Sequence, residues 1–162
     1  MYKNVHPILR SLKPAAPAGL LLAIAGCVQQ ATMAAVSIPP VRPGAARIWV
    51  YRAYEPYAGK GLPAVDANGG YLGQAQLGGV FYRDVAPGAY HVTVESFGKD
   101  INQSANLDLA AGQQKYVKIV SLPSWVEGGD RTAYERPTFY AWLMPPQVAA
   151  ADVAHLAFYG GS

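Results

Sequence analysis

The stretch APGAYHVTVES, residues 86–96, carries the clearest structural signal in the chain. Pro87 followed by Gly88 is typical of a tight turn, because Pro restricts φ at one position and Gly accepts a positive φ at the next. After the turn, apolar and polar side chains alternate from Tyr90 to Glu95. A period of two is the pattern of a strand with one buried face. The stretch therefore predicts a turn that leads into a β-strand.

Similar strand signals recur on both sides of this stretch. Residues 46–54, ARIWVYRAY, are apolar on both faces, which predicts a central and well-covered strand. Asn68-Gly69-Gly70 predicts a hairpin turn between two extended pieces. Residues 101–109 alternate more weakly and predict an exposed or edge strand. Further strands are expected at 78–85, 115–122 and 138–145.

Short strands separated by turn signals predict an all-β protein, with a single antiparallel β-sandwich of about seven strands over residues 46–145. A small, partly open barrel is the alternative arrangement. Residues 125–137 are polar and contain glycine, which predicts a long surface loop. Two prolines, an apolar spacing and two glycines predict a short C-terminal helix and tail over residues 146–162.

The segment before the sandwich has the layout of an export signal. Residues 1–26 combine basic residues, an apolar run up to Ala25 and two small residues, Ala25 and Gly26, at the end, as a secretory signal peptide does. The run is far shorter than the roughly 20 residues that span a bilayer. Cys27, the only cysteine, follows directly and has no partner for an internal disulfide. Residues 27–45, rich in Pro and nearly uncharged, predict a flexible linker.

The four residues Ile24, Ala25, Gly26 and Cys27 resemble the lipobox of bacterial lipoproteins. The resemblance implies a diacylglyceryl group on the Cys27 sulfur, cleavage just before Cys27, and acylation of the new amino group, for example with palmitate. An Asp directly after the lipidated cysteine resembles an inner-membrane retention signal, but this chain has Val28 at that position. The absence of Asp favours the outer membrane and a domain that faces the periplasm. An ordinary signal peptide that contains a cysteine, or a buried free cysteine, is the alternative.

The charge of the chain argues against nucleic-acid binding. The sequence has 13 Lys and Arg against 10 Asp and Glu, and three of the basic residues precede Cys27. The remainder is therefore neutral, and it has no cluster of basic residues. A protein that binds nucleic acid needs such a cluster to neutralise phosphates. The sequence therefore predicts no nucleic-acid partner.

From Ala46 to about Val120 the chain resembles a β-sandwich domain found in many proteobacterial lipoproteins of unknown function. The matching pieces are ARIWVYR, the Asn-Gly turn, VFYRDVAPGAYHVTV and AGQQKYVKIV. The Pro-Gly-aromatic element is also similar to PEGA-type and carboxypeptidase-regulatory-like modules, which share a transthyretin-like sandwich. The resemblance implies a lipid-anchored envelope protein without an established activity, and it supplies no catalytic residues.

The sequence contains no recognisable catalytic or metal-binding pattern. The three histidines lack metal-ligand spacing, so neither a metal nor another cofactor is expected. The serines form no nucleophile elbow and no Ser/His/Asp pattern, which predicts a protein that is not an enzyme. An envelope hydrolase stays open as an alternative, because Glu127, Asp130 and Glu135 lie in one predicted loop and paired carboxylates can cleave glycosidic bonds.

Aromatic residues are numerous for a small domain, and those in the predicted loop are candidates for a binding surface. Trp125 and Tyr134 are the two that we single out, since exposed aromatic rings anchor proteins and stack on sugars. The sequence thus predicts a structural or protein-interaction module whose partners are membrane lipid and envelope proteins. A module that binds carbohydrate or peptidoglycan through exposed aromatic rings is the alternative.

Overall fold

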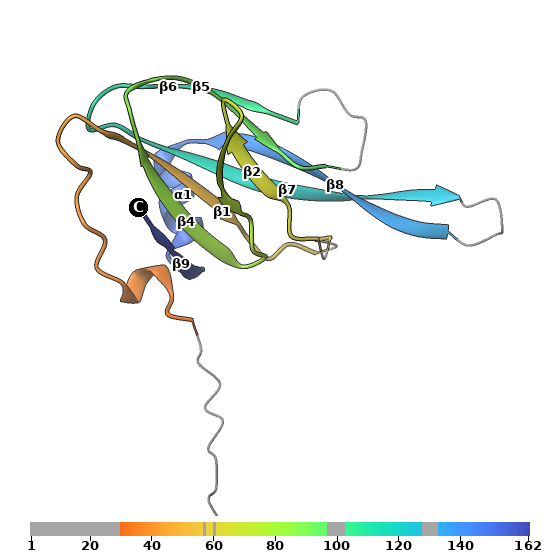
Figure 1. Cartoon of the computed structure of the whole chain (residues 1–162). Helices are drawn as coiled ribbons and strands as arrows, with labels where there is room; N and C mark the ends of the chain where they lie inside the picture. Colours follow the sequence, from red (N-terminus) through yellow and green to blue (C-terminus); the bar gives the residue numbers. More distant parts are fainter. Residues whose placement is uncertain (1–29, 57, 60, 97–102, 128–132) are drawn as a thin grey trace, which may run out of the picture.

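The computed structural model describes residues 30–56, 58–59, 61–96, 103–127 and 133–162, which form two β-sheets, one α-helix and one 3₁₀ turn (Figure 1). The strands are β1 (Ala46–Arg52), β2 (Ala64–Ala67), β3 (Gly70–Gln74), β4 (Gly79–Val85), β5 (Gly88–Val94), β6 (Ala105–Leu109), β7 (Gln114–Glu127), β8 (Ala133–Met144) and β9 (Ala157–Gly161). The helix is α1 (Pro146–Val153), and the 3₁₀ turn is η1 (Met33–Ala35). Within the described residues no helix is long and apolar enough to cross a membrane.

The strands form a five-stranded sheet in the order β8-β7-β1-β4-β9 and a four-stranded sheet in the order β3-β2-β5-β6. The all-β expectation is therefore confirmed as a sandwich-like arrangement of two sheets, and the barrel alternative is wrong. The described residues form nine strands where about seven were expected. The prediction of a purely antiparallel fold is also wrong, because β1 pairs with β7, and β4 with β9, in parallel. The strands of each parallel pair are far apart in the sequence. The alternation of side chains along one strand does not indicate which distant strand it pairs with, or in which direction.

The main core lies between the two sheets. Ile48 and Val50 of β1 contribute to it from the five-stranded sheet, and Val92 of β5 contributes from the four-stranded sheet. The residues between them along each strand point to the other side, as the pleat requires. The predicted alternation of residues 90–95 is confirmed, since Val92 and Val94 are buried and His91 is exposed.

Two other sequence predictions are confirmed at the four-stranded sheet. Asn68 and Gly69 have φ angles of 50° and 78° and join β2 to β3. Two successive positive φ values are the mark of a tight hairpin turn, which explains the choice of Asn-Gly. Strand β6, predicted as an edge strand, does lie at the edge of its sheet.

The prediction of a long surface loop at 125–137 is wrong. Strand β7 continues to Glu127, and β8 begins at Ala133, so most of this stretch forms a two-stranded hairpin. The hairpin runs beyond the sandwich in Figure 1. Its polar residues do not prevent pairing, because the ladder is made by backbone N–H and C=O groups. An alternating pattern arises only where one face of a strand is buried.

The outer face of the five-stranded sheet is covered by a second apolar layer. Trp49 and Tyr51 of β1 lie on this face with Val80 and Tyr82 of β4. Ala149 and Val153 of α1 and Leu156 after it are buried against this face. Met33 and Ile38, from the segment before β1, are partly buried against it. The prediction that residues 46–54 are covered on both faces is thus confirmed, and all seven residues of β1 are buried.

The prediction of a flexible linker over residues 27–45 is wrong for residues 30–45, because these residues are part of the fold. The N–H of Met33 donates to the carbonyl of Leu156 at 2.8 Å, and the N–H of Phe158 donates to the carbonyl of Ala31 at 2.8 Å. Thr32 forms a β-bridge with Ala157. The physical reason is the apolar outer face of the sheet, which would otherwise lie open to water. Residues 1–29 lie outside the described part of the chain.

The tail prediction for residues 146–162 is right for the helix and wrong after it. Helix α1 spans Pro146–Val153, and strand β9 follows and pairs with β4. Gly161 of β9 lies directly on the ring of Tyr82, where a Cβ atom would come within 2.0 Å of the ring. Gly161, one of the two glycines that suggested a helix end, therefore allows β9 to approach the sheet closely.

Candidate functional site

The residues that the sequence singled out are only partly placed by the structure. Cys27 and the three residues before it lie outside the described residues. Trp125 pairs with Glu135, and Tyr134 with Val126, so their backbones occupy neighbouring registers of the β7–β8 hairpin. Their side chains lie outside the described part of the structure.

A buried ion pair joins Arg47 of β1 to Asp84 of β4. The two residues are direct cross-strand partners, and Arg47 is 2% exposed. Arg47 Nε donates to Asp84 Oδ1 at 2.6 Å, and Nη2 donates to Oδ2 at 3.1 Å. The guanidinium carbon lies 3.8 Å from the centre of the Tyr82 ring, which adds a cation–π contact. Such a two-bond pairing of Arg with a carboxylate sets both position and orientation.

The same guanidinium holds the segment that precedes β1. Arg47 Nη1 donates to the carbonyl of Pro39 at 2.8 Å, and Nη2 lies 3.5 Å from the carbonyl of Pro40. Arg42, further along, places its Nε 3.6 Å from Asp84 Oδ2. We call these residues (Arg47, Asp84, Pro39, Pro40 and Arg42) the proline clamp. The clamp joins the chain that follows Cys27 to the centre of the five-stranded sheet.

The charge state of the clamp follows from its hydrogen bonds. Hydrogen bonds from Arg47 hold the pKa of the Asp84 carboxyl below its ordinary value, although burial opposes them. The proximity of the charged Arg47 and Arg42 lowers this pKa further. Asp84 is therefore a carboxylate at neutral pH and has no proton to give, so a general acid at this position is excluded.

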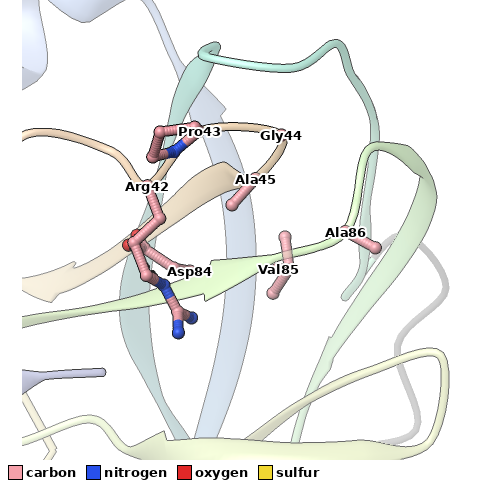
Figure 2. Close-up of a pocket in the computed structure, with 7 residues that line it drawn as sticks. All are labelled: Arg42, Pro43, Gly44, Ala45, Asp84, Val85 and Ala86. Atoms are coloured by element: carbon pink, nitrogen blue, oxygen red, sulfur yellow. Dashed lines mark ion pairs between the residues drawn. The ribbon is translucent and has the colours of Figure 1, made fainter.

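Beside the clamp lies an open hollow of about 340 Å³ (Figure 2). It is lined by residues 42–45 of the turn before β1 and residues 84–86 at the end of β4. Figure 2 shows Arg42 and Asp84 on the same side of it, with small side chains around the rest. The carboxylate already accepts bonds from Arg47, so the hollow offers a ligand little beyond the exposed side chain of Arg42.

A second polar cluster lies on the outer face of the same sheet, toward the other end of β1. Lys118 Nζ lies 2.6 Å from Glu55 Oε1 and 3.9 Å from Asp152 Oδ2. The Tyr51 hydroxyl donates to Asp152 Oδ2 at 3.0 Å. Burial, and then this bond, raise the pKa of Tyr51 above its ordinary value, so the hydroxyl stays protonated. Trp142, the cross-strand partner of Lys118, is 48% exposed and borders this cluster.

A third feature is a hollow of about 240 Å³ against strands β5 and β6 of the four-stranded sheet. His91 Nδ1 lies 2.7 Å from Asn106 Oδ1, and the His91 N–H donates to Asn68 Oδ1 at 2.8 Å. This places His91 outward, as predicted. Among the described residues no three His, Cys, Asp or Glu side chains are grouped so that they could hold a metal ion.

Comparisons with known proteins found no matching family model, no matching curated protein and no matching solved structure.

The proline clamp is the feature that the sequence analysis did not predict. Its only signal was the presence of Arg47 and Arg52 in a strand that is apolar on both faces. A buried Arg needs a carboxylate or several carbonyl groups as partners, but the sequence does not say which.

Proposed function

We propose that this chain is a lipoprotein of the bacterial envelope, anchored in the outer membrane through Cys27 and facing the periplasm. Its β-domain acts without catalysis, as a structural or protein-interaction module. The signal-like residues 1–26, the lipobox-like residues before Cys27 and the resemblance of residues 46–120 to lipoprotein domains support the proposal. Val28 in place of Asp supports the outer membrane.

The lipobox-like residues before Cys27 carry this proposal, and the docking of residues 30–45 adds a consequence for how such an anchor would hold the domain. The first described residue, Gln30, lies only three positions after Cys27. From there to β1 the chain is held by backbone hydrogen bonds to residues 154–158 and by the proline clamp. A lipid on Cys27 would thus pull on the folded domain itself, with almost no free tether between them. Several acyl chains would hold it firmly, since each buried methylene contributes about 0.8 kcal/mol.

Replacement of Cys27 with Ser is expected to abolish lipid attachment and to leave residues 1–26 in place, because the thiol is the acceptor of the lipid. Intact-mass analysis of the membrane-extracted protein measures both events at once. Ser37→Ala, an exposed change in the same segment, is the matched control: it keeps the wild-type cleavage and acyl mass gain, and its mass is lower only by the one oxygen atom removed. A Cys27→Ser protein with the same mass gain and membrane partition as the wild type would contradict the proposal.

A carbohydrate- or peptidoglycan-binding module is the second candidate, and the cluster around Trp142 favours it. An exposed indole next to Lys118, Glu55 and Asp152 combines a stacking surface with charged hydrogen-bonding groups. Sugar recognition commonly needs these two components together. Trp125 and Tyr134, which the sequence singles out as a binding surface, belong to the same β7–β8 hairpin and would add further aromatic rings to this site.

For this second candidate, Trp142→Ala is expected to weaken binding of peptidoglycan fragments at least about tenfold, as loss of an aromatic anchor does. Trp125→Ala and Tyr134→Ala test the sequence-based version in the same titration. Tyr71→Ala, an exposed aromatic on β3, is the control and should bind as the wild type does. Wild-type protein that binds no fragment, or binding that survives all three changes, removes the candidate.

A further inference from the structure

The place where the chain leaves the described domain is well defined. The Gln30 side-chain amide donates to the carbonyl of Phe158, and the Ala31 carbonyl accepts from the N–H of Phe158 at 2.8 Å. Phe158 belongs to β9, at the edge of the five-stranded sheet. Gln30 is therefore fixed against this edge of the sandwich.

The distance from this point to the proposed lipid is short. Gln30 lies three positions after Cys27, and three residue steps span at most about 11 Å even when fully extended. A domain of this size has a radius of gyration of about 14 Å. With a tether shorter than its own radius, the domain cannot turn its opposite end toward the bilayer.

Hydrogen bonds show which other segments share this end of the sandwich. Ala157 N donates to the Gly78 carbonyl at 2.9 Å, and Gly78 N donates to the Arg52 carbonyl at 2.8 Å. The Arg52 side chain continues the series, since its Nη1 donates to the Gly61 carbonyl at 2.6 Å. The end of β1, the start of β4, the start of β9 and the loop before β2 therefore lie together.

Three exposed apolar side chains belong to these segments. Tyr54 is 75% exposed and its ring lies on Gly78, whereas Tyr159 is 46% exposed and its ring lies on Gly79. The adjacent glycines leave room for both rings, since a Cβ at either position would meet a tyrosine below 3.0 Å. Leu62, next to Gly61, is also exposed.

The chemistry of this end suits a membrane surface. Tyr has an apolar ring and a polar tip, and it is enriched where lipid headgroups meet hydrocarbon. Glu55, the acidic neighbour of Tyr54, is paired with Lys118 at 2.6 Å and so adds little repulsion toward anionic lipid. In Figure 1, η1 and β9 lie at the lower side of the molecule, whereas β5 and β6 lie at its upper side.

We propose that the domain rests on the bilayer through the end that carries Gln30, Tyr54 and Tyr159, with the β2–β3 turn at the far end of the sandwich, away from the membrane. The occupant of this surface is the lipid headgroup layer of the membrane that holds Cys27. The inference rests on the proposed lipid anchor. It leaves the hollow beside His91 on the side that a periplasmic partner can reach.

The test uses the full lipidated chain in phosphatidylcholine vesicles that contain a nitroxide-headgroup lipid. Because lipid occupies the only native thiol, a cysteine introduced at Tyr159, Tyr54 or Tyr71 is the single site for an NBD label. The label at Tyr159→Cys or Tyr54→Cys is expected to lose more than about half of its emission, since interfacial groups lie within ~5–10 Å of the headgroup boundary. The label at Tyr71→Cys, 64% exposed after the β2–β3 turn, should keep most of its emission.

A second variant inserts ten Gly/Ser residues between Gln29 and Gln30. The longer tether has a mean span of about 20 Å, so the quenching at Tyr159→Cys should fall toward that at Tyr71→Cys. Equal quenching at all three sites, or stronger quenching at Tyr71→Cys, overturns the orientation while the lipid anchor stands. An intact mass without acyl groups overturns both the anchor and the orientation, so the two failures are distinguished.

Discussion

Replacement of Asp84 with Ala is expected to lower the free energy of unfolding by about 3–5 kcal/mol, the usual cost of removing one partner of a buried ion pair. The change leaves the Arg47 guanidinium inside the protein without its carboxylate. Two carbonyl contacts, to Pro39 and Pro40, do not neutralise a positive charge. The clamp on the segment before β1 is weakened at the same time.

The urea midpoint, measured on the wild type and on Asp84→Ala, checks this expectation. Asp108→Ala on the edge strand β6 removes an exposed carboxylate and is the control, with a change within about 0.5 kcal/mol. The double variant Arg47→Met with Asp84→Leu should be more stable than Asp84→Ala alone, because an apolar pair leaves no buried charge. A loss below about 1 kcal/mol for Asp84→Ala would show that the pair is not buried as described.

The same pair makes stability depend on pH. The pKa of Asp84 is lower in the folded than in the unfolded protein, so the unfolded state binds more protons in acid. The stabilisation from the pair is present above the unfolded pKa and is lost as the pH falls through the folded pKa. The fall in urea midpoint below about pH 4 should therefore be smaller in Asp84→Ala than in the wild type.

Replacement of Trp49 with Ala is expected to cost about 3–5 kcal/mol, as the loss of a large buried aromatic side chain does. Trp49 lies at the centre of the outer apolar layer. Its ring stacks on Tyr116 at a centroid distance of 5.9 Å and contacts Tyr82 at 4.9 Å. The indole N–H also donates to Gln114 Oε1 at 2.8 Å, so the change leaves a cavity and an unpaired acceptor.

Two measurements distinguish this loss from a general weakening. The urea midpoint reports total stability, with Tyr71→Ala as the exposed aromatic control. Amide hydrogen exchange at Met33 and Phe158 reports the docking of residues 31–34 on residues 154–158, because these N–H groups bond across that contact. Exchange at both amides should become faster in Trp49→Ala. Unchanged exchange would mean that the outer layer does not hold the segment.

Local patterns were enough to predict several elements of the fold. The alternation after Pro87-Gly88 predicted β5 and its buried face, and Asn68-Gly69 predicted the turn between β2 and β3. The doubly apolar ARIWVYR predicted the central position of β1. In each case a few adjacent residues both determine the backbone conformation and show which face is buried.

The same reasoning failed where a segment is held by distant partners. Residues 125–127 and 133–137 form paired strands because backbone groups pair along β7 and β8, whatever their side chains are. The proline clamp joins residues 37 positions apart, Arg47 and Asp84. Neither residue has a neighbour in the sequence that reveals the other. The candidate site was therefore visible only as a buried Arg that needed a partner.

Local sequence patterns specify the β-class of the domain, the positions of its tight turns and the burial of β1 on both faces. Each of these depends on side chains a few residues apart. The closure of the outer face of the five-stranded sheet by residues 30–45 and β9 follows instead from the assembled fold. This closure depends on an aromatic surface around Trp49, which exists only once β1, β4 and β7 lie side by side. Its burial then supplies the free energy that turns an apparent linker into part of the fold.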